Sequence, residues 1–559
     1  MSKITGAQVM AEMLKGYGVT HIFHVPAVLR ATMVELEKRT DIKRLHVHSE
    51  ATAAYMADGY ARATGKPGVC MAQVIGALNL AAGLRDAWLA KAPVIAMTGG
   101  RDPKTKFRNV YQEVDDMPAF EPVTKFNATV DDVARFPDMV RQAFRAATTG
   151  TPGPVHLQFR GNEAQIDAEE ADMEALVEDA FAQLPPYRPE PSEESLRTAM
   201  AAIEAADRPV IVAGGGVRAS RAQMDVVALA ERLNIPVATS LNGKDTIPAS
   251  HPLSVGVVGT YSRESANTIV SEADLVVYIG STTGGMVSHF WKVPKIDTKI
   301  VHIDIEPQEI GRNYSVVAGV QGDAKVALIR MLAMARTESA SRRTAWAARA
   351  AEADQQWRNK YKDLLTSDAE PMRPERICKE LSDHLPNDAI VVADTGHTGM
   401  WMGGMFDLRS PEQSYMRSAG HLGWSFPAAL GAKCGVPDRP VFCFTGDAGF
   451  LYHIGDVETA ARCGINTVTL VNNNSSGNQS KRGFDRVYGG EQTDEARKLW
   501  QFTDLNFARI AEEMGVVGIR VERPGEVAGA IQQAFEVAKN RPVILDVTSD
   551  LNALAPLAE

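Results

Sequence analysis

Two polar segments near the C-terminal end of the chain carry residues suited to bind a metal ion and phosphate groups. The first follows the apolar run 442–445 and consists of Gly446, Asp447, Ala448 and Gly449. The second is the asparagine run 472–474, which follows the apolar run 467–471. Both apolar runs are typical of buried strands, so parallel pairing would bring the two polar segments to one edge of a sheet.

Asp447, Asn474 and Ser476 are the predicted metal ligands at this edge. A carboxylate, an amide oxygen and a loop carbonyl would form an oxygen-only shell, which suits Mg²⁺ and leaves room for phosphate oxygens and water. Taken singly, each segment is also explained by a strand-exit turn or by asparagines that cap a loop. The pair at this spacing favours the metal site.

A Gly-Asp-Gly/Ala motif with an asparagine 27 residues after the aspartate is the thiamine-diphosphate signature. The chain therefore resembles acetolactate synthase-like enzymes, of the pyruvate oxidase and decarboxylase family. The resemblance extends over nearly the whole length: residues 50–65 are similar to the helix with the activating glutamate, 111–115 to an active-site loop, and 301–311 to part of the central domain. It implies thiamine diphosphate and Mg²⁺ as cofactors, the former bound in part by residues 446–449 and Asn474.

Strand-like apolar runs alternate with helical segments in three parts of the chain, which predicts an α/β fold of three doubly wound domains. We place them at residues 1–182, 193–335 and 371–550. In the resembled family these are the pyrimidine-binding, central and diphosphate-binding domains. The proline-dense segment 184–192 predicts an extended linker, and 335–365, which lacks glycine and proline, predicts one long connecting helix.

Glu50 is the residue that the resemblance identifies as the activator of the cofactor. In the family this glutamate binds nitrogen N1′ of the aminopyrimidine and promotes loss of the proton from C2 of the thiazolium. Glu50 follows the strand-like run 45–48 and begins a predicted helix, where a carboxylate also interacts favourably with the helix dipole. Its position alone leaves both roles open. Ser49 stands where the family usually has a histidine.

Residues 394–401 are predicted to contact the diphosphate. They follow a strand-like run, so the first turn of the next helix would present backbone N–H groups and a hydroxyl to an anion. The residues concerned are Gly396, His397 and Thr398. His397 would reach either the phosphate or the substrate, and a surface histidine near a helix start is the alternative interpretation.

Residues 418–432 resemble the loop and helix that bend the cofactor into its V shape. The resemblance implies that the Gly420 carbonyl accepts a hydrogen bond from the 4′-amino group and that Leu422 lies between the two rings. Leu422 is equally compatible with a place in the core, where leucine is common.

Gln112 and His24 are the predicted residues on the substrate side. Gln112 aligns with a family glutamine that faces cofactor and substrate. His24 lies where acetolactate synthases carry a glycine-rich loop, and here Ala27 and Val28 replace its glycines. We expect the Val28 side chain to occupy space near the thiazolium, which changes the pocket and makes His24 a candidate acid or base. A histidine packed under the loop is the alternative.

The central segment departs from the synthases in a second way. They carry an arginine-rich stretch that contacts FAD and substrate, whereas residues 280–286 contain no arginine. The glycine triplet 214–216 is compatible with a nucleotide-facing turn, yet a triplet alone is weak evidence. FAD is therefore a doubtful cofactor.

Composition excludes several classes of partner. The 559 residues carry a net charge of −10, which predicts no nucleic-acid partner, and no apolar run reaches the ~20 residues of a membrane span. The five cysteines are scattered, as in reduced cytoplasmic proteins. The resemblance implies a homodimer or homotetramer with active sites at the subunit interface.

The leading hypothesis is a thiamine-diphosphate enzyme that makes or cleaves a C–C bond next to the carbonyl of a small substrate. The alternatives are a 2-hydroxyacyl-CoA or oxalyl-CoA lyase and a catalytically silent cofactor-binding subunit. The lost glycines and arginines predict poor formation of acetolactate from pyruvate. His24 and His397 instead suggest a pocket that moves protons on a hydroxyl or ketone group, which favours cleavage of an acyloin or diketone, or decarboxylation of a bulkier 2-ketoacid.

Overall fold

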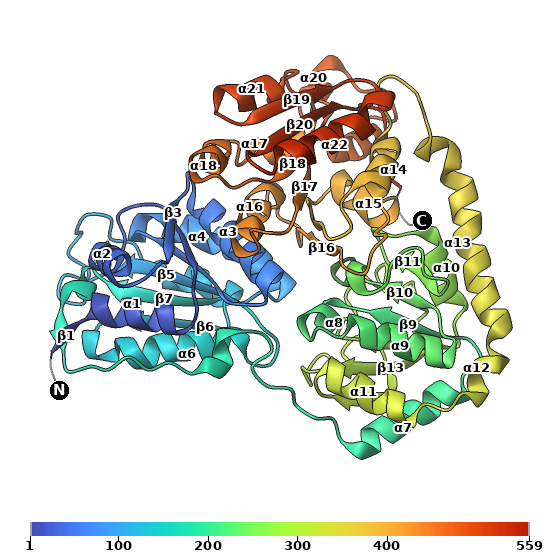
Figure 1. The fold of residues 1–559 in the computed structure, drawn as a ribbon, viewed down its shortest axis with the longest axis horizontal. Coiled ribbons are helices and arrows are strands. Elements are labelled where there is room, and N and C mark those ends of the chain that lie inside the picture. Colours follow the sequence, from blue (N-terminus) through green and yellow to red (C-terminus); the bar gives the residue numbers. More distant parts are fainter. Residues whose placement is uncertain (1–2, 557–559) are drawn as a thin grey trace.

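The computed structural model describes residues 3–556 and contains three α/β domains, each built on a six-stranded sheet with helices on both faces (Figure 1). All strand pairs within these three sheets are parallel. The predicted fold class is confirmed. Residues 1 and 2 of the predicted first domain lie outside the described residues.

The N-terminal sheet has the order β3-β2-β4-β5-β7-β6. Its strands are β2 (His21–His24), β3 (Lys43–His46), β4 (Gly68–Ala72), β5 (Val94–Gly100), β6 (Phe126–Val130) and β7 (Val155–Arg160). Its helices are α1 (Gly6–Gly16), α2 (Arg30–Arg39), α3 (Glu50–Thr64), α4 (Ala77–Ala90), α5 (Met117–Phe120) and α6 (Phe136–Thr148). Two short antiparallel strands, β1 (Ile4–Thr5) and β8 (Glu170–Ala171), lie beside it.

The central sheet has the order β11-β10-β9-β12-β13-β14. Its strands are β9 (Pro209–Ala213), β10 (Val237–Thr239), β11 (Ser254–Val257), β12 (Leu275–Ile279), β13 (Lys299–Asp304) and β14 (Val316–Gln321). Its helices are α7 (Glu193–Ala205), α8 (Gly215–Ala219), α9 (Gln223–Leu233), α10 (Glu264–Glu272) and α11 (Ala324–Met334).

The C-terminal sheet has the order β16-β15-β17-β18-β20-β19. Its strands are β15 (Ile390–Ala393), β16 (Ser414–Arg417), β17 (Val441–Gly446), β18 (Val468–Asn473), β19 (Val517–Val521) and β20 (Val543–Thr548). Its helices are α14 (Pro374–His384), α15 (His397–Gly404), α16 (Ser425–Gly435), α17 (Asp447–Leu451), α18 (Asp456–Cys463), α19 (Gln479–Val487), α20 (Asp494–Arg497), α21 (Phe507–Glu513) and α22 (Val527–Val537).

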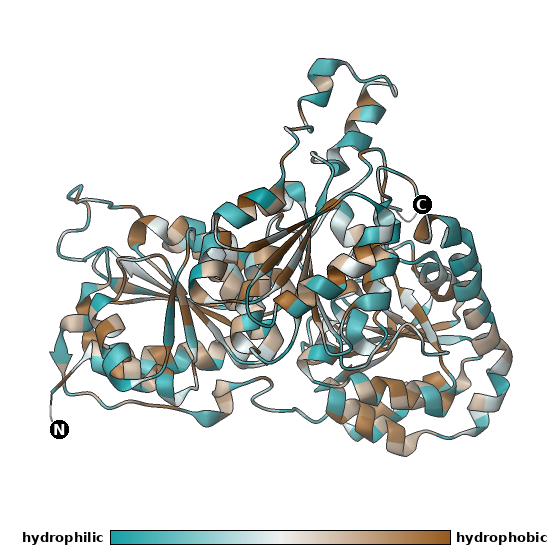
Figure 2. Ribbon diagram, turned by 45° about the horizontal axis from the view of Figure 1, so that its top comes forward, coloured by the Kyte–Doolittle hydropathy of each residue, from teal (hydrophilic) through white to brown (hydrophobic). Residues whose placement is uncertain are grey.

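The strands are apolar because both faces of each sheet are covered. Every residue of β12 is buried, and in Figure 2 the strands are largely brown, whereas the helices around them carry both brown and teal segments. Among the described residues, no helix has both the length and the hydropathy of a membrane span.

The connection between the central and C-terminal domains differs from the single helix predicted over 335–365. It consists of α12 (Glu338–Arg342) and α13 (Thr344–Leu365), which Figure 1 shows along the outer side of both domains. The break lies at Arg343, whose side chain is fully buried and donates to the carbonyls of Leu233, Ile203 and Ala206. These bonds to the central domain hold the chain in a non-helical conformation, so the prediction of one continuous helix was wrong.

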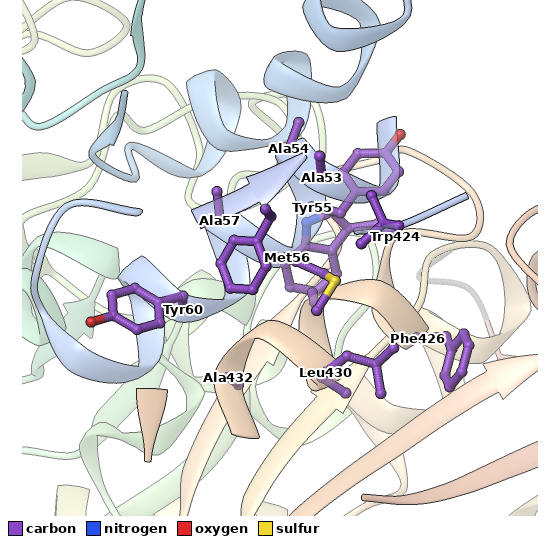
Figure 3. Close-up of a cluster of buried hydrophobic side chains, with 14 of the residues drawn as sticks. Ala53, Ala54, Tyr55, Met56, Ala57, Tyr60, Trp424, Phe426, Leu430 and Ala432 are labelled. Carbon is purple, nitrogen blue, oxygen red and sulfur yellow. The ribbon is translucent and has the colours of Figure 1, made fainter. Parts of the chain in front are cut away.

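The N- and C-terminal domains share one apolar core, in which α3 packs across α16 (Figure 3). The contact is close because each helix presents a glycine to the other. A Cβ on Gly59 would lie 2.0 Å from the Ala428 carbonyl oxygen, and one on Gly431 would lie 1.9 Å from that of Met56. Any larger residue at either glycine would push the two domains apart.

Candidate functional site

The metal-ligand residues predicted from the sequence lie together at the carboxyl edge of the C-terminal sheet. Asp447 begins α17 directly after β17, and Asn474 directly follows the neighbouring strand β18. One Asp447 carboxylate oxygen accepts from the backbone N–H groups of Asn474 (2.9 Å) and Ser476 (3.1 Å). The Ser476 hydroxyl donates to the Asn474 side-chain oxygen at 2.7 Å.

The chemistry of these donors fits a hard divalent cation. Asp447 is 2% exposed, and burial raises the pKa of its carboxyl to about 6. The hydrogen bonds that it accepts from backbone N–H groups lower the pKa and partly offset this effect. The described residues hold no group of three His, Cys, Asp or Glu side chains able to bind a metal. A cation at Asp447 would therefore depend on one carboxylate, on amide and carbonyl oxygens, and on oxygens from its ligand.

The predicted diphosphate segment lies beside this edge. Gly396 has φ +70°, and α15 begins directly after it with His397 and Thr398. A Cβ on Gly446 would lie 3.3 Å from the Thr398 hydroxyl, so the first turn of α15 faces the end of β17. This places backbone N–H groups of a helix start next to Asp447, an arrangement that suits an anion.

His397 is buried, so its alternative interpretation as a surface histidine was wrong. Its side chain is 6% exposed, and neither ring nitrogen has a hydrogen-bond partner. Burial lowers its pKa to about 4, with a smaller contribution from the charge of Arg482. A buried polar group without a partner costs free energy, which points to an external ligand for this ring.

The loop between β16 and α16 has a backbone path that requires glycine. Gly420 has φ +147° and Gly423 has φ +89°. Gly420 is exposed, and Leu422 is half-buried and belongs to none of the apolar clusters formed by the described residues. The alternative of Leu422 as a core residue was therefore wrong.

Glu50 begins α3, as expected, at the carboxyl edge of the N-terminal sheet. It is half-buried, and its carboxylate accepts from the Asn79 side-chain amide at 3.1 Å. A Cβ on Gly76 would lie 2.4 Å from the other carboxylate oxygen, so this glycine provides the space for Glu50. The geometry is compatible with both predicted roles, because the carboxylate is accessible and also lies in the first turn of a helix.

His24 and Gln112 lie at the same edge. His24 ends β2, its Nδ1 is buried without a partner, and burial lowers its pKa to about 4. The Gln112 side-chain oxygen accepts from Gln73, which follows β4, and from Asn162, at 3.2 and 3.4 Å. The N-terminal edge thus brings together the Glu50 carboxylate, the His24 imidazole and a group of amides.

The structure corrects the prediction for the loop after His24. Ala27 has φ +75°, a conformation that glycine adopts with less strain, so the backbone retains a glycine-like path. The Val28 side chain is 2% exposed and packs in the apolar core of the N-terminal domain. It therefore does not occupy space in a pocket, and the expectation that it narrows the site was wrong.

A cavity of about 720 Å³ lies between the N-terminal and central domains. On the central side it is lined by the glycine turn 215–216 after β9 and by Asp304 and Glu306 at the end of β13. Lys91 and Lys125 line it from the N-terminal domain. Its position at the carboxyl ends of the central strands is that of a ligand crevice in a doubly wound sheet.

Comparison with known proteins gives three family matches along the chain. Residues 4–119 match the thiamine pyrophosphate enzyme N-terminal TPP binding domain, residues 196–332 the central domain, and residues 394–547 the C-terminal TPP binding domain. The chain is 33% identical to a probable acetolactate synthase large subunit of Methanocaldococcus jannaschii, over 99% of this chain and 93% of that protein. It is 31% identical to the acetolactate synthase large subunit of Corynebacterium glutamicum, with 97% and 86% covered.

Proposed function

The chain belongs to the thiamine pyrophosphate enzyme family, and from this we propose that it uses thiamine diphosphate and Mg²⁺ to make or cleave a C–C bond next to the carbonyl of a small ketoacid or ketone. The observation that carries the proposal is the meeting of Asp447, Asn474 and Ser476, with distances of 2.9 and 3.1 Å from the Asp447 carboxylate to the two backbone nitrogens. Glu50 at the N-terminal edge completes the set of residues that the chemistry needs.

We assign the cation to Asp447, the Asn474 side-chain oxygen and the Ser476 carbonyl. The diphosphate would lie against the first turn of α15 and the turn after β17, that is, against Gly396, His397, Thr398, Gly446, Ala448 and Gly449. Here a helix start, glycine turns and a cation would together neutralise its negative charge.

Bound thiamine diphosphate would supply a carbon nucleophile that attacks the substrate carbonyl. Glu50 would hold a proton at nitrogen N1′ of the aminopyrimidine, the Gly420 carbonyl would accept from the 4′-amino group, and Leu422 would keep the two rings apart. The pKa values of His24 and His397 near 4 leave both rings neutral at pH 7, so each can donate from one nitrogen and accept at the other. Together with Gln112 they would orient the substrate oxygen and move protons.

We propose that the protein is a homodimer or homotetramer with its active sites at the subunit interface. Gly76 and Asn79 contact Glu50, and their apolar neighbours Ile75 and Leu78 are 56% and 50% exposed in the single chain. Tyr111, which precedes Gln112, is 80% exposed. Such a surface beside a catalytic carboxylate supports burial by a second subunit. Light scattering of the holoenzyme tests this, and a monomer that turns over substrate at full rate would contradict it.

The reaction that we favour is cleavage of an acyloin or diketone, or decarboxylation of a bulkier 2-ketoacid. The support is the absence of arginine from residues 280–286 and the two neutral histidines. Turnover should be measured with a panel of ketoacids, diketones and acyloins. Acetolactate formation from pyruvate with a kcat/KM at or above ~10⁴ M⁻¹s⁻¹ would reject this choice in favour of the synthase reaction.

A 2-hydroxyacyl-CoA or oxalyl-CoA lyase is the second candidate, and the 720 Å³ cavity is the observation that favours it. Lys91, Lys125 and Arg312 line this cavity and would suit the phosphates of a nucleotide. Adding both CoA esters to the substrate panel separates the two candidates. If no substrate of the panel is turned over, the protein would be a catalytically silent cofactor-binding subunit. This alternative is disfavoured because the chain retains Glu50, Asp447 and Asn474. FAD remains outside the proposal.

A further inference from the structure

The loop that would shape the cofactor is held at both ends by buried carboxylates from different domains. It runs from Ser418 to Trp424, between β16 and α16, and has no regular structure of its own. Its two positive-φ glycines give it many alternative paths. Contacts from outside the loop must therefore select the observed one.

The first carboxylate belongs to Asp86, on α4 of the N-terminal domain. Asp86 is fully buried and accepts hydrogen bonds from the backbone N–H groups of Ala419 (2.9 Å) and His421 (3.3 Å). It also accepts from the Ser418 hydroxyl at 3.0 Å. Arg62 on α3 lies 2.8 Å from the same carboxylate, which compensates the burial of its charge. Asp86 thus binds the loop on both sides of Gly420.

The second carboxylate belongs to Asp394, at the end of β15 in the C-terminal domain. It too is fully buried, and it accepts from the Gly423 N–H at 3.2 Å and from the Ser425 hydroxyl at 2.7 Å. A Cβ on Gly449 would lie 3.2 Å from the same carboxylate oxygen that binds Ser425. Asp394 therefore fixes the loop just after Leu422 and also contacts the turn that carries Asp447.

We propose that Asp86 and Asp394 are positioning residues that set the path of the loop, so that the Gly420 carbonyl and Leu422 face the cofactor only while the N- and C-terminal domains are docked. This inference rests on the proposed function for the roles of Gly420 and Leu422. Hydrogen bonds that backbone N–H groups donate to a charged carboxylate are about twice as strong as neutral ones, so two buried carboxylates can fix a short loop. A displacement of about 1 Å in such a site costs roughly 10² in rate.

The test is Asp86→Asn in the full-length holoenzyme. Asparagine has the shape of aspartate, but its side-chain NH₂ group cannot accept the hydrogen bonds that Ser418, Ala419 and His421 donate to Asp86. The loop should therefore shift. We expect kcat to fall about 10²-fold, the near-ultraviolet circular dichroism of the bound aminopyrimidine to change, and the Kd for thiamine diphosphate to stay close to wild type. Tm should fall, because Arg62 loses one of its two buried carboxylate partners. The metal and diphosphate residues are unchanged in this variant.

Asp58→Asn is the matched control. Asp58 is also fully buried, pairs with the same Arg62 at 2.7 Å and accepts from the indole N–H of Trp424, the last residue of the loop, but it accepts nothing from the loop backbone. We expect a much smaller loss of kcat and an unchanged dichroism band. Wild-type kcat in Asp86→Asn, or an equal loss in Asp58→Asn, would overturn the inference.

Amide hydrogen exchange of the cofactor-free protein gives a test that needs no activity. Peptides covering 418–425 should be protected in the wild type and should exchange faster in Asp86→Asn. If residues 418–425 of the wild type exchange as fast as the exposed segment 487–491, the positioning role is refuted. This comparison needs only the wild type, so it holds even if the variant does not fold. A wild-type protein that shows this protection but binds no thiamine diphosphate would refute the proposed function instead.

Discussion

The N- and C-terminal domains have the same connectivity and different chemistry. In both sheets the strands follow the order second, first, third, fourth, sixth and fifth along the chain. The helix after the second strand is α3 in one domain and α16 in the other, and these two helices pack against each other. Glu50 begins the first of them, whereas the second begins after the loop with Gly420 and Leu422. Equivalent positions in one fold therefore carry a carboxylate and a glycine-containing loop, to which the proposed function gives different roles.

The central domain sharpens this contrast because its strand order is different, namely third, second, first, fourth, fifth and sixth. This is the order of dinucleotide-binding sheets, whose ligand crevice lies where the order reverses. The 720 Å³ cavity lies at that edge. Connectivity thus separates the central domain from the other two, which share one strand order and differ in the residues at their strand ends.

The largest expected effect comes from the C-terminal edge. Asp447→Ala should abolish binding of both Mg²⁺ and thiamine diphosphate, because the cation would link the diphosphate to the protein. Titration calorimetry measures both, and dialysis against EDTA should remove the two together. Asp438→Ala, an exposed carboxylate of the same domain, is the control. Unchanged cofactor affinity in metal-free protein would contradict the assignment.

The N-terminal edge should behave in the opposite way. Glu50→Gln is expected to keep the fold and most of the cofactor affinity, while exchange of the cofactor C2 proton slows by about 10²- to 10⁴-fold. Proton exchange followed by NMR measures this directly, with the exposed Glu37→Gln as the control. If the C2 proton exchanges at the wild-type rate in Glu50→Gln, Glu50 does not activate the cofactor, and the N-terminal edge has no catalytic role distinct from the binding role of the C-terminal edge.

Most of the fold and the C-terminal edge could be predicted from the sequence, because buried parallel strands are continuous apolar runs and the polar residues follow them directly. Asp447 and Asn474 are examples of residues whose neighbours in space are set by strand pairing alone. The break at Arg343 could not be predicted, since it depends on carbonyls more than a hundred residues away.

The environments of single side chains could not be predicted from the sequence either. Val28 was expected in a pocket and lies in the core, because the direction of a loop side chain depends on tertiary packing. The contacts of Asp86 with residues 418–421 could not be predicted, because Asp86 belongs to no recognised motif. An aspartate on the buried face of a largely apolar helix such as α4 is nevertheless a signal, since a buried carboxylate needs partners.

A smaller effect is expected for His397→Asn. Because neither ring nitrogen bonds within the protein, its removal should leave Tm nearly unchanged. Loss of one general acid or base should lower kcat/KM by about 10²-fold or more. Thermal melts and steady-state kinetics on the best substrate of the panel measure both quantities. A large fall in Tm with unchanged kinetics would make His397 a structural residue.

The smallest effect on activity is expected at the contact between the central and C-terminal domains. Lys244 is buried there and donates to the carbonyls of Gly403 and Phe406 at 2.9 and 2.8 Å, bonds that a neutral amine can also make. Burial lowers its pKa to about 7, whereas in the unfolded chain it is about 10.4. Between these pH values the unfolded chain holds a proton that the folded protein lacks, so this lysine makes stability rise with pH across that window. In Lys244→Met the rise in Tm from pH 7 to pH 9.5 should be smaller than in the wild type, while the exposed Lys66→Met should behave like the wild type.

The same pH dependence of Tm in all three proteins would show that Lys244 stays charged in the folded state. A loss of cofactor binding in Lys244→Met would show that the cofactor site includes the contact between the central and C-terminal domains, and not only the edges of the N- and C-terminal sheets.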